Sequence, residues 1–407
     1  MRRKLFFWSL ALLALPLLAA APAQAGAKIE IGDDAVIDLG FRLQAQYFST
    51  EKDLDGGGDF EDFDDFIVRR ARLRLGADVT DRVSIFLQSE FADDDGGVGG
   101  DVRLIDAYVT LKAHKLTNII VGENMAASLR QNLTSSGALM AVDRPAIVNK
   151  NLSWGTRAKY GFTNTNYDDS DAGLRADNLA RDVGATLFGS DSITDTLHFK
   201  YYLGVYDGVQ EGDEDSERYA ARVQFNLFDA EPKYYNLSTY LGGKRTLGFG
   251  ATYDLQNDVA VDLATGKNAD YAMWTVDAFA DLPLGPGALT LETAWIDLDL
   301  DDAARLNFNG DGASFRDARQ AQGDGYYIQA GYFISNWQPW VLYEQWSSDG
   351  PGDLGSFNAL RVGLSYFLKG HNANIKVGYE GFSADRNLSG TSEDSVDSLV
   401  AGLYVTY

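Results

Sequence analysis

The sequence predicts an all-β transmembrane barrel of about 16 antiparallel strands, with short turns at one end and long acidic loops at the other. Three observations support this prediction. Segments of about ten residues alternate apolar and polar side chains, and the connections between them alternate between short and long. After the first 25 residues, no apolar run is long enough for a membrane-spanning helix.

The first 25 residues have the layout of a signal peptide. A positive segment, Arg2 to Lys4, precedes an apolar stretch from Leu5 to Ala20 and a small-x-small cleavage site at Ala23 to Ala25. We therefore expect a cleaved signal peptide at residues 1–25, a barrel domain at residues 26–407, and export to the bacterial outer membrane. A retained membrane anchor is the alternative.

The charge balance excludes several classes of protein. The chain has 35 Lys and Arg against 59 Asp and Glu, a net charge of −24, which becomes −27 without the three basic residues of the predicted signal peptide. Nucleic acid is an improbable partner, because binding it depends on neutralising phosphates. The absence of cysteine excludes disulfides, thiolate metal sites and c-type haem attachment. We expect neither a cofactor nor a metal site.

Period-two alternation defines the strands. In the C-terminal segment, for example, Leu399, Ala401, Leu403, Val405 and Tyr407 share one face. The predicted strands are residues 35–48, 66–77, 83–92, 102–113, 118–123, 181–189, 196–206, 218–228, 246–255, 271–282, 288–297, 325–334, 338–347, 357–367, 374–382 and 398–407. Alternation alone would also fit a soluble β-sandwich.

The lengths of the connections favour the barrel. Short turns are predicted at 80–82, 191–195, 283–287, 335–336 and 368–373. Long segments rich in Asp and Gly are predicted at 49–65, 92–101, 207–217, 256–269, 299–324, 348–356 and 383–397. Outer-membrane barrels have this asymmetry, with the long loops outside, and about 16 strands leave an aqueous lumen. Residues 124–180 are predicted to hold an infolded constriction loop, with a further hairpin near 154–162 left open.

Several segments resemble one family. The stretch Phe66 to Leu75, followed by Val83 to Glu90, is similar to the early hairpin of the phosphate-selective porin O and P family. Further similarities lie at 104–109 and 118–122 (its next strands), 133–136 through 143–145 (its constricting third loop), 204–208 (a strand end) and 403–407 (a terminal assembly signal). The resemblance implies a sixteen-stranded, homotrimeric porin that passes small ions, with anion preference in its best-known members.

One departure from the family concerns selectivity. Family members commonly have lysines just after the glycine that opens the third loop, and these lysines select phosphate. This chain has Glu123, Asn124 and Met125 at that place. Selection of phosphate therefore stays open.

Alternate arginines are the main candidates for contact with a solute. If Ile67, Ala71, Leu73 and Leu75 face lipid, the side chains of Arg70, Arg72 and Arg74 point into the lumen. The reverse orientation would cost about 2–4 kcal/mol for each arginine at the midplane. The same parity turns five further basic strand residues inward, and two more basic residues lie in the predicted constriction loop: Lys112, Lys200, Arg222, Arg361 and Lys376 on strands, and Arg130 and Arg144 in the loop.

Guanidinium groups lining a narrow pore would stabilise passing anions. The alternative is that these arginines pair with inward carboxylates such as Asp106, Glu90 and Glu380, which would brace the wall and leave a weakly selective pore.

Enzyme motifs are missing, so we expect no catalytic residue. The only histidines are His114, His198 and His371, and no G-x-S-x-G, H-E-x-x-H or P-loop element occurs. The main hypothesis is a passive, anion-favouring channel surrounded by outer-membrane lipid and lipopolysaccharide. A general or cation-leaning porin, and a structural or adhesion barrel whose acidic loops bind a partner, are the alternatives.

Overall fold

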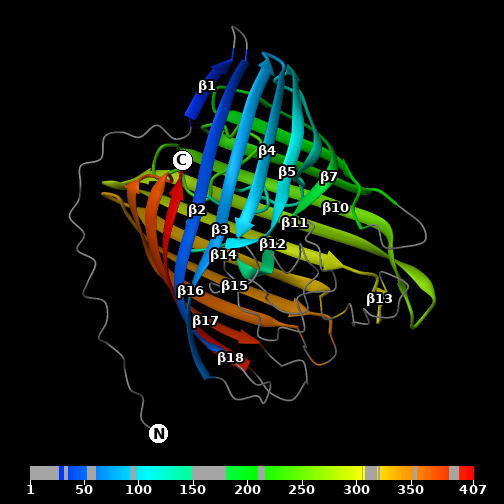
Figure 1. Ribbon diagram of the computed structural model, residues 1–407. Coiled ribbons are helices and arrows are strands. Elements are labelled where there is room, and N and C mark those ends of the chain that lie inside the picture. The colour runs from blue at the N-terminus through cyan, green and yellow to red at the C-terminus, as the bar shows by residue number, and fades with distance from the viewer. Residues whose placement is uncertain are drawn as a thin grey trace.

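The protein forms a closed barrel of sixteen antiparallel β-strands (Figure 1). The computed structural model describes residues 27–31, 35–52, 61–92, 98–148, 180–209, 216–304, 306–307, 319, 321–350, 352, 355–384 and 394–407. The barrel strands are β2 (Ala35–Lys52), β3 (Glu61–Thr80), β4 (Val83–Ala92), β5 (Val98–His114), β6 (Thr117–Met125), β7 (Arg181–Ser192), β8 (Leu197–Tyr206), β9 (Arg218–Phe228), β10 (Thr246–Asp262), β11 (Lys267–Leu284), β12 (Gly287–Asp299), β14 (Gly323–Phe333), β15 (Trp337–Ser348), β16 (Phe357–Lys369), β17 (Ala373–Ala384) and β18 (Asp394–Thr406).

The barrel closes where the last strand meets the first. β18 pairs with β2 from Ser398 opposite Thr50 to Thr406 opposite Arg42. Tyr407 and Phe41 extend this ladder by exchanging two backbone hydrogen bonds, of 2.7 and 2.8 Å. Closure gives hydrogen-bond partners to the backbone groups along the free edges of both strands. A sheet in hydrocarbon needs these partners, because no water is available there to bind unpaired N–H and C=O groups.

Two short strands lie outside the sixteen. β1 (Ala27–Ile31) pairs with β2, Ala27 opposite Leu39, and so prolongs the wall beyond the end of β18. β13 (Leu306–Asn307) pairs with Val261 and Asp262 near the end of β10. The predicted loop at 256–269 is wrong in part, because β10 and β11 continue to a turn at 263–266 as a protruding hairpin with a bulge between Gln256 and Ala260.

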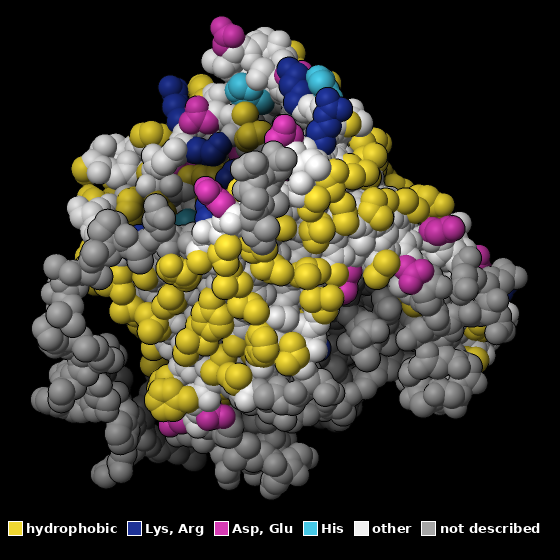
Figure 2. All heavy atoms as spheres, turned by 45° about the horizontal axis from the view of Figure 1, so that its top comes forward, with side chains coloured by type: hydrophobic (Ala, Val, Ile, Leu, Met, Phe, Trp, Pro, Cys, Tyr) yellow, Lys and Arg dark blue, Asp and Glu magenta, His cyan; other side chains and the backbone are white. Residues whose placement is uncertain are grey.

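The two faces of the wall contact different surroundings. Large apolar side chains are exposed on the outer face along nearly every strand, and Figure 2 shows them as a broad hydrophobic area with charged side chains gathered at its upper end. Leu73 and Leu75 of β3 point outward, with 41% and 36% of their surface exposed. Arg70 and Arg72 are buried inside the barrel. An apolar outside around a polar inside is the arrangement of a barrel in lipid.

Ile67 is an exception to the predicted parity. It is 9% exposed and belongs to a buried cluster inside the barrel with Met140 and Trp340. The reason is a β-bulge: Arg70 pairs with Gln44 and Val68 with Ala45, so Arg69 is an extra residue. An extra residue reverses the in-out alternation beyond it. The expectation that Ile67 faces lipid is therefore wrong.

The two ends of the barrel differ as predicted in most connections. Short turns at 81–82, 115–116, 193–196, 285–286, 334–336 and 370–372 lie at one end, here called the short-turn end. The exception at this end is the 17-residue connection from Asp229 to Arg245, which is neither among the predicted short turns nor among the predicted long loops. The other end is here called the long-loop end. The predicted extra hairpin at 154–162 and the predicted signal peptide fall outside the described residues. Across the part of the chain that the structure describes, no helix is both long and apolar enough to cross a membrane.

Candidate functional site

Two segments enter the barrel from opposite ends. Residues 126–148, here called the 126–148 loop, follow β6 from the long-loop end and are almost entirely buried. Residues 229–245, here called the 229–245 insert, connect β9 to β10 from the short-turn end. Because backbone groups away from bulk water need partners, such segments must be held by the wall or by each other.

The 126–148 loop is fixed to the β15–β17 side of the wall. Arg361 Nη1 donates to the carbonyl oxygen of Arg144 at 2.9 Å, and Lys376 Nζ donates to that of Ala141 at 2.9 Å. In return, Glu344 Oε2 accepts a hydrogen bond of 2.9 Å from the backbone N–H of Ile147. These bonds anchor the second half of the loop to that part of the wall.

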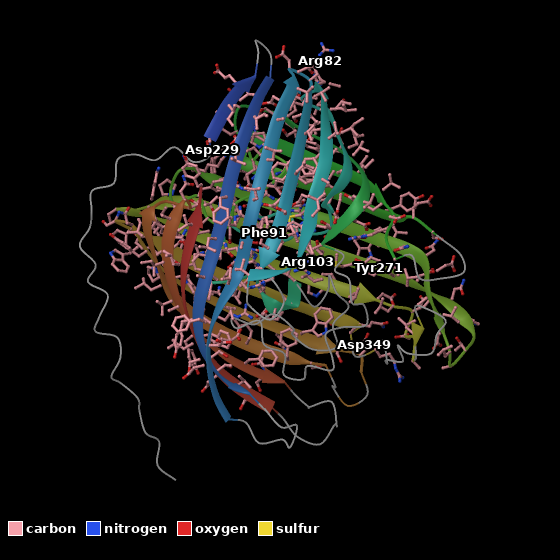
Figure 3. The ribbon with its side chains drawn as sticks, viewed as in Figure 1. Arg82, Phe91, Arg103, Asp229, Tyr271 and Asp349 are labelled. Atoms are coloured by element: carbon pink, nitrogen blue, oxygen red, sulfur yellow. The ribbon has the colours of Figure 1, made fainter. Side chains whose placement is uncertain are left out.

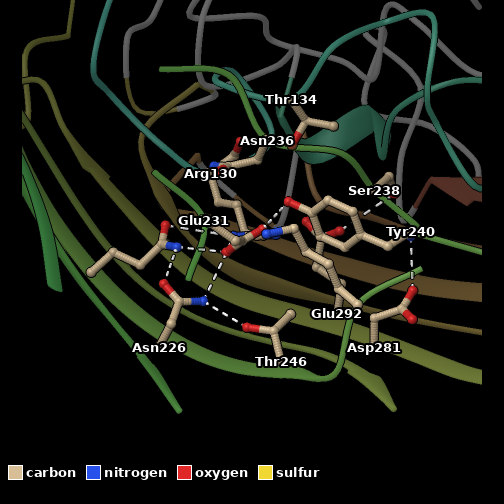
Figure 4. Close-up of polar contacts among 12 residues, drawn as sticks. Arg130, Thr134, Asn226, Glu231, Asn236, Ser238, Tyr240, Thr246, Asp281 and Glu292 are labelled. Carbon is tan, nitrogen blue, oxygen red and sulfur yellow. Dashed lines mark hydrogen bonds and ion pairs between the residues drawn. The ribbon is translucent and has the colours of Figure 1, made fainter. Parts of the chain in front are cut away.

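The 229–245 insert contacts the 126–148 loop inside the barrel, and Figure 4 shows polar residues of both segments close together. Thr134 and Asn236 form a parallel bridge, in which the N–H of Asn236 donates to Leu133 O at 2.8 Å and the N–H of Ser135 donates to Asn236 O at 3.1 Å. Ser238 N–H also donates to Ala138 O, at 3.1 Å. The two segments thus satisfy part of each other's backbone.

A buried ion pair joins the same two segments. The Arg130 guanidinium donates to both oxygens of Glu231, at 3.0 and 2.9 Å, and lies 3.9 Å above the ring of Phe279. Gln224 and Asn226 of β9 donate to Glu231 as well. Burial alone would raise the pKa of Glu231, but the charge and hydrogen bonds of Arg130 hold it well below its usual range.

A hollow remains between these segments and the opposite side of the wall. Its volume is about 430 Å³ and it is open to solvent. The residues that line it come from β2 to β7, the 126–148 loop and the 229–245 insert: Arg42, Arg72, Arg74, Phe86, Gln88, Asp106, Met125, Ser135, Ser136, Arg181 and Tyr235. Four of these residues are arginines and only one is acidic.

Two of the four arginines have carboxylate partners. Arg72 pairs with Glu90 at 2.5 Å, and Arg181 pairs with Asp106 at 3.2 Å. Arg42 and Arg74 form no ion pair with any described residue: Arg42 donates to Ser136 and Ser135, and Arg74 to the carbonyl oxygen of Tyr407. Buried Nε atoms of both also lack a hydrogen-bond acceptor among the described residues. The hollow therefore has an excess of positive charge.

Ser136 lies between two of these guanidinium groups. Its hydroxyl oxygen accepts hydrogen bonds from Arg42 Nη1 at 2.7 Å and from Arg72 Nη1 at 3.3 Å. A hydroxyl has two acceptor positions and one hydrogen to donate. With both acceptor positions used, the hydrogen is left for an acceptor in the hollow.

The predicted pore residues fall into different settings. Arg74 and the guanidinium group of Arg72 line the hollow. Arg70 lies on the long-loop side of the hollow and donates to Gln44 and Asp143. Lys112 lies exposed near the short-turn end and pairs with Asp78 at 3.0 Å. Arg144 donates to two carbonyl oxygens within its own loop. Burial and then the charge of Arg70 lower the pKa of Arg144 to about 9, which reflects the crowding of cations here.

The remaining predicted arginines brace the interior. Arg222 pairs with Asp277 at 2.5 Å, and Arg361 pairs with Glu344 at 2.9 Å and with Glu380. Together with Arg130, they form the buried pairs that the alternative interpretation describes. Among the carboxylates named there, Glu90, Asp106 and Glu380 each accept an arginine.

Sequence reasoning missed Arg42, Arg181, Ser135 and Ser136. Arg42 could have been found, because Gly40, Arg42, Gln44 and Gln46 alternate with apolar residues along the first predicted strand. No pattern marks Arg181, which begins a strand, or the two serines, whose position depends on how the 126–148 loop folds.

Comparison with known proteins agrees with this architecture. An uncharacterized protein of Aquifex aeolicus is 23% identical over 306 residues, which are 70% of this chain and 63% of that protein, so this chain spans less than two thirds of the relative. The anion-selective porin of Comamonas acidovorans has a similar structure, with a TM-score of 0.58, 14% identity and coverage of 92% of this chain and all of that one. The trimer form of Vibrio cholerae OmpT, an outer membrane protein, is also similar, with a TM-score of 0.53, 12% identity and coverage of 92% of this chain and 100% of that one.

Identities this low show the fold alone. The sequence model of the phosphate-selective porin O and P family, however, matches residues 37–407, nearly the whole chain. The family and the fold indicate an outer-membrane channel rather than an enzyme. This chain belongs to the phosphate-selective porin O and P family.

Proposed function

We propose that the chain forms a passive channel that favours small anions, and that the hollow beside the 126–148 loop is its narrowest part. The single observation behind this proposal is the unpaired charge of Arg42 and Arg74 in the hollow, where Asp106 is the one acidic lining residue. A fixed positive charge in a narrow, partly dehydrated passage attracts anions and repels cations.

The proposed path of the anion begins on the long-loop side of the hollow. Arg70 and Arg72 precede Arg74 on alternate inward positions of β3, and Arg42 is opposite Arg72 on β2. An anion can pass from one guanidinium to the next, because conduction needs several weak sites rather than one strong one. Ser136 would donate its hydroxyl hydrogen to the passing ion.

The alternative, a cation-leaning porin, rests on the acidic composition. Its candidates inside the barrel are carboxylates such as Glu292 and Asp281, which are 1% and 0% exposed. Glu292 accepts hydrogen bonds from Gln131 and Tyr327, and neither acid lines the hollow. The anion preference is therefore better supported.

The reversal potential in a KCl gradient across a planar bilayer tests the proposal. The wild-type channel should give the sign of an anion-selective pore, and the double variant R42Q/R74Q should move it toward zero. The matched control is Arg82→Gln, which removes an exposed charge at a short turn (Figure 3) and should leave the potential unchanged. A cation-selective wild type, or an unaffected double variant, would contradict the proposal. Folded protein without conductance would favour the adhesion alternative.

We also propose that the signal peptide is cleaved, that the barrel is a homotrimer, and that outer-membrane lipid and lipopolysaccharide surround it. The trimeric form of a similarly folded protein supports the second point. Crosslinking in native membranes tests it: a ladder ending at three chains is expected, and a lone monomer band would refute it.

A further inference from the structure

The hollow is lined by apolar groups as well as by guanidinium groups. Phe86 of β4, Met125 at the end of β6 and Tyr235 of the 229–245 insert all contribute to it. Phe86 also packs against Tyr108 of β5, with ring centroids 5.3 Å apart. An inorganic ion gains nothing from such surfaces, whereas the apolar body of an organic ion is stabilised when it leaves water against them.

Strand register orders these groups along the pore. On β3 and β4, Arg72 is opposite Glu90, Arg74 opposite Gln88, and Gly76 opposite Phe86, in successive inward positions toward the short-turn end. Tyr108 of the next strand is opposite Phe86. A solute that enters from the long-loop end therefore meets guanidinium groups first and aromatic rings immediately after them.

The mixture of apolar and polar groups in the hollow also suits an organic ion. Sites for small organic molecules combine apolar walls with a few polar groups that fix orientation. Here Arg42, Arg74 and the hydroxyl of Ser136 are the polar groups with unused donors.

We propose that the hollow binds an organic anion with an acidic head group and an apolar body, of which an aromatic carboxylate is the simplest example. The head group contacts Arg42, Arg74 and Ser136, and the body lies toward Phe86 and Tyr235. This inference rests on the proposed anion preference and adds the chemical class of the solute.

Block of the chloride current through the full-length channel tests this proposal. The probes are benzoate, acetate, inorganic phosphate and neutral benzyl alcohol, each added to a bilayer that holds the wild-type protein. Benzoate should block at a concentration at least about tenfold lower than acetate or phosphate, equivalent to about 1.4 kcal/mol. Benzyl alcohol, which lacks the charged head group, should not block.

Two variants separate the aromatic contribution from the charge. Phe86→Ala and, independently, Tyr235→Ala should bring benzoate within about twofold of acetate, while the reversal potential keeps the sign of an anion-selective pore. The matched control is Phe249→Ala, which removes an outward-facing ring that is 51% exposed and should keep the difference. Heat-modifiable mobility on gels confirms that each variant is folded.

The outcomes are distinct. If benzoate and acetate block equally while the channel remains anion-selective, the organic-anion proposal is wrong and the anion preference stands. Stronger block by phosphate, or equal block by benzyl alcohol, would also overturn it. A cation-selective wild type would overturn both proposals.

Discussion

Arg130 and Glu231 form a two-point ion pair that links segments entering the barrel from opposite ends. Both side chains are 1% exposed, and their two N–O distances are 3.0 and 2.9 Å. Arg130 belongs to the 126–148 loop and Glu231 to the 229–245 insert, so the pair holds the two segments together inside the barrel. Removing one member of a buried pair costs about 3–5 kcal/mol, because the other charge stays buried without compensation.

Breaking this pair should loosen the interior. In Glu231→Gln, the new amide nitrogen cannot accept the hydrogen bond that a carboxylate oxygen accepts from Arg130, so the two segments should separate more often. We expect a noisier single-channel current with a higher mean conductance. Asp229→Asn, the same acid-to-amide change at an exposed position of the insert, should behave like wild type.

A second replacement tests whether the pair itself is responsible. Replacing a buried pair by apolar residues of similar volume is often neutral or stabilising. The double variant Arg130→Met with Glu231→Met should therefore recover much of the quiet wild-type current that either single variant loses. Additive losses in the double variant would show that the two residues act separately.

The barrel wall could be predicted from the sequence, but its contents could not. All sixteen predicted strands exist, because the in-out alternation is a local property that two solvents impose on every strand. The error at Ile67 has a local cause as well: a single bulged residue, Arg69, changes the parity, and nothing in the residues near it announces the bulge.

The interior depends on contacts between segments far apart in sequence. The insert at 229–245 is rich in tyrosine, unlike the acidic loops, and this was a signal that it does not lie in water. An arginine can find its carboxylate partner far along the chain: Arg222 pairs with Asp277, 55 residues away. The arginines that stay unpaired therefore cannot be identified from their neighbours in sequence. A sequence pattern shows that an arginine points inward, but not whether it is paired.

Anion selectivity should depend on the ion pair between Arg72 and Glu90. Arg72→Gln would leave the carboxylate of Glu90 beside the hollow without its partner, so anion selectivity should fall more than in Arg42→Gln, which unmasks no acid. The double variant R72Q/E90Q keeps the net charge and should recover most of the selectivity. Reversal potentials in a KCl gradient measure all three, and a double variant no better than R72Q would refute this account.

Gly137 allows the loop to approach Arg42. A Cβ atom at this position would lie 2.7 Å from Arg42 Nη2 and 2.9 Å from its Cζ. Gly137→Ala should therefore displace the guanidinium or the loop and change the single-channel conductance by a measurable fraction without unfolding the barrel. Gly381→Ala, whose new methyl group would meet nothing closer than 3.5 Å, is the matched control. Equal conductance in the two variants would mean that the contact is unimportant.

His371 makes the 229–245 insert sensitive to acid. Its Nε2–H donates to the carbonyl oxygen of Thr239 at 2.9 Å, and burial lowers the pKa of His371 to about 4, from an ordinary value near 6.5. The unfolded chain therefore takes up this proton at a higher pH than the folded one, so the contribution of His371 to stability is complete above pH 6.5 and is lost as the pH falls toward 4. The loss is at most about 3 kcal/mol, at 1.36 kcal/mol for each pKa unit.

Urea unfolding between pH 7 and pH 4 measures this loss. The free energy of unfolding should decline less in His371→Gln than in wild type. His114→Gln, which changes an exposed position near a turn, should decline like wild type. If the free energy of unfolding declines equally in all three proteins, burial of His371 does not contribute to the acid sensitivity.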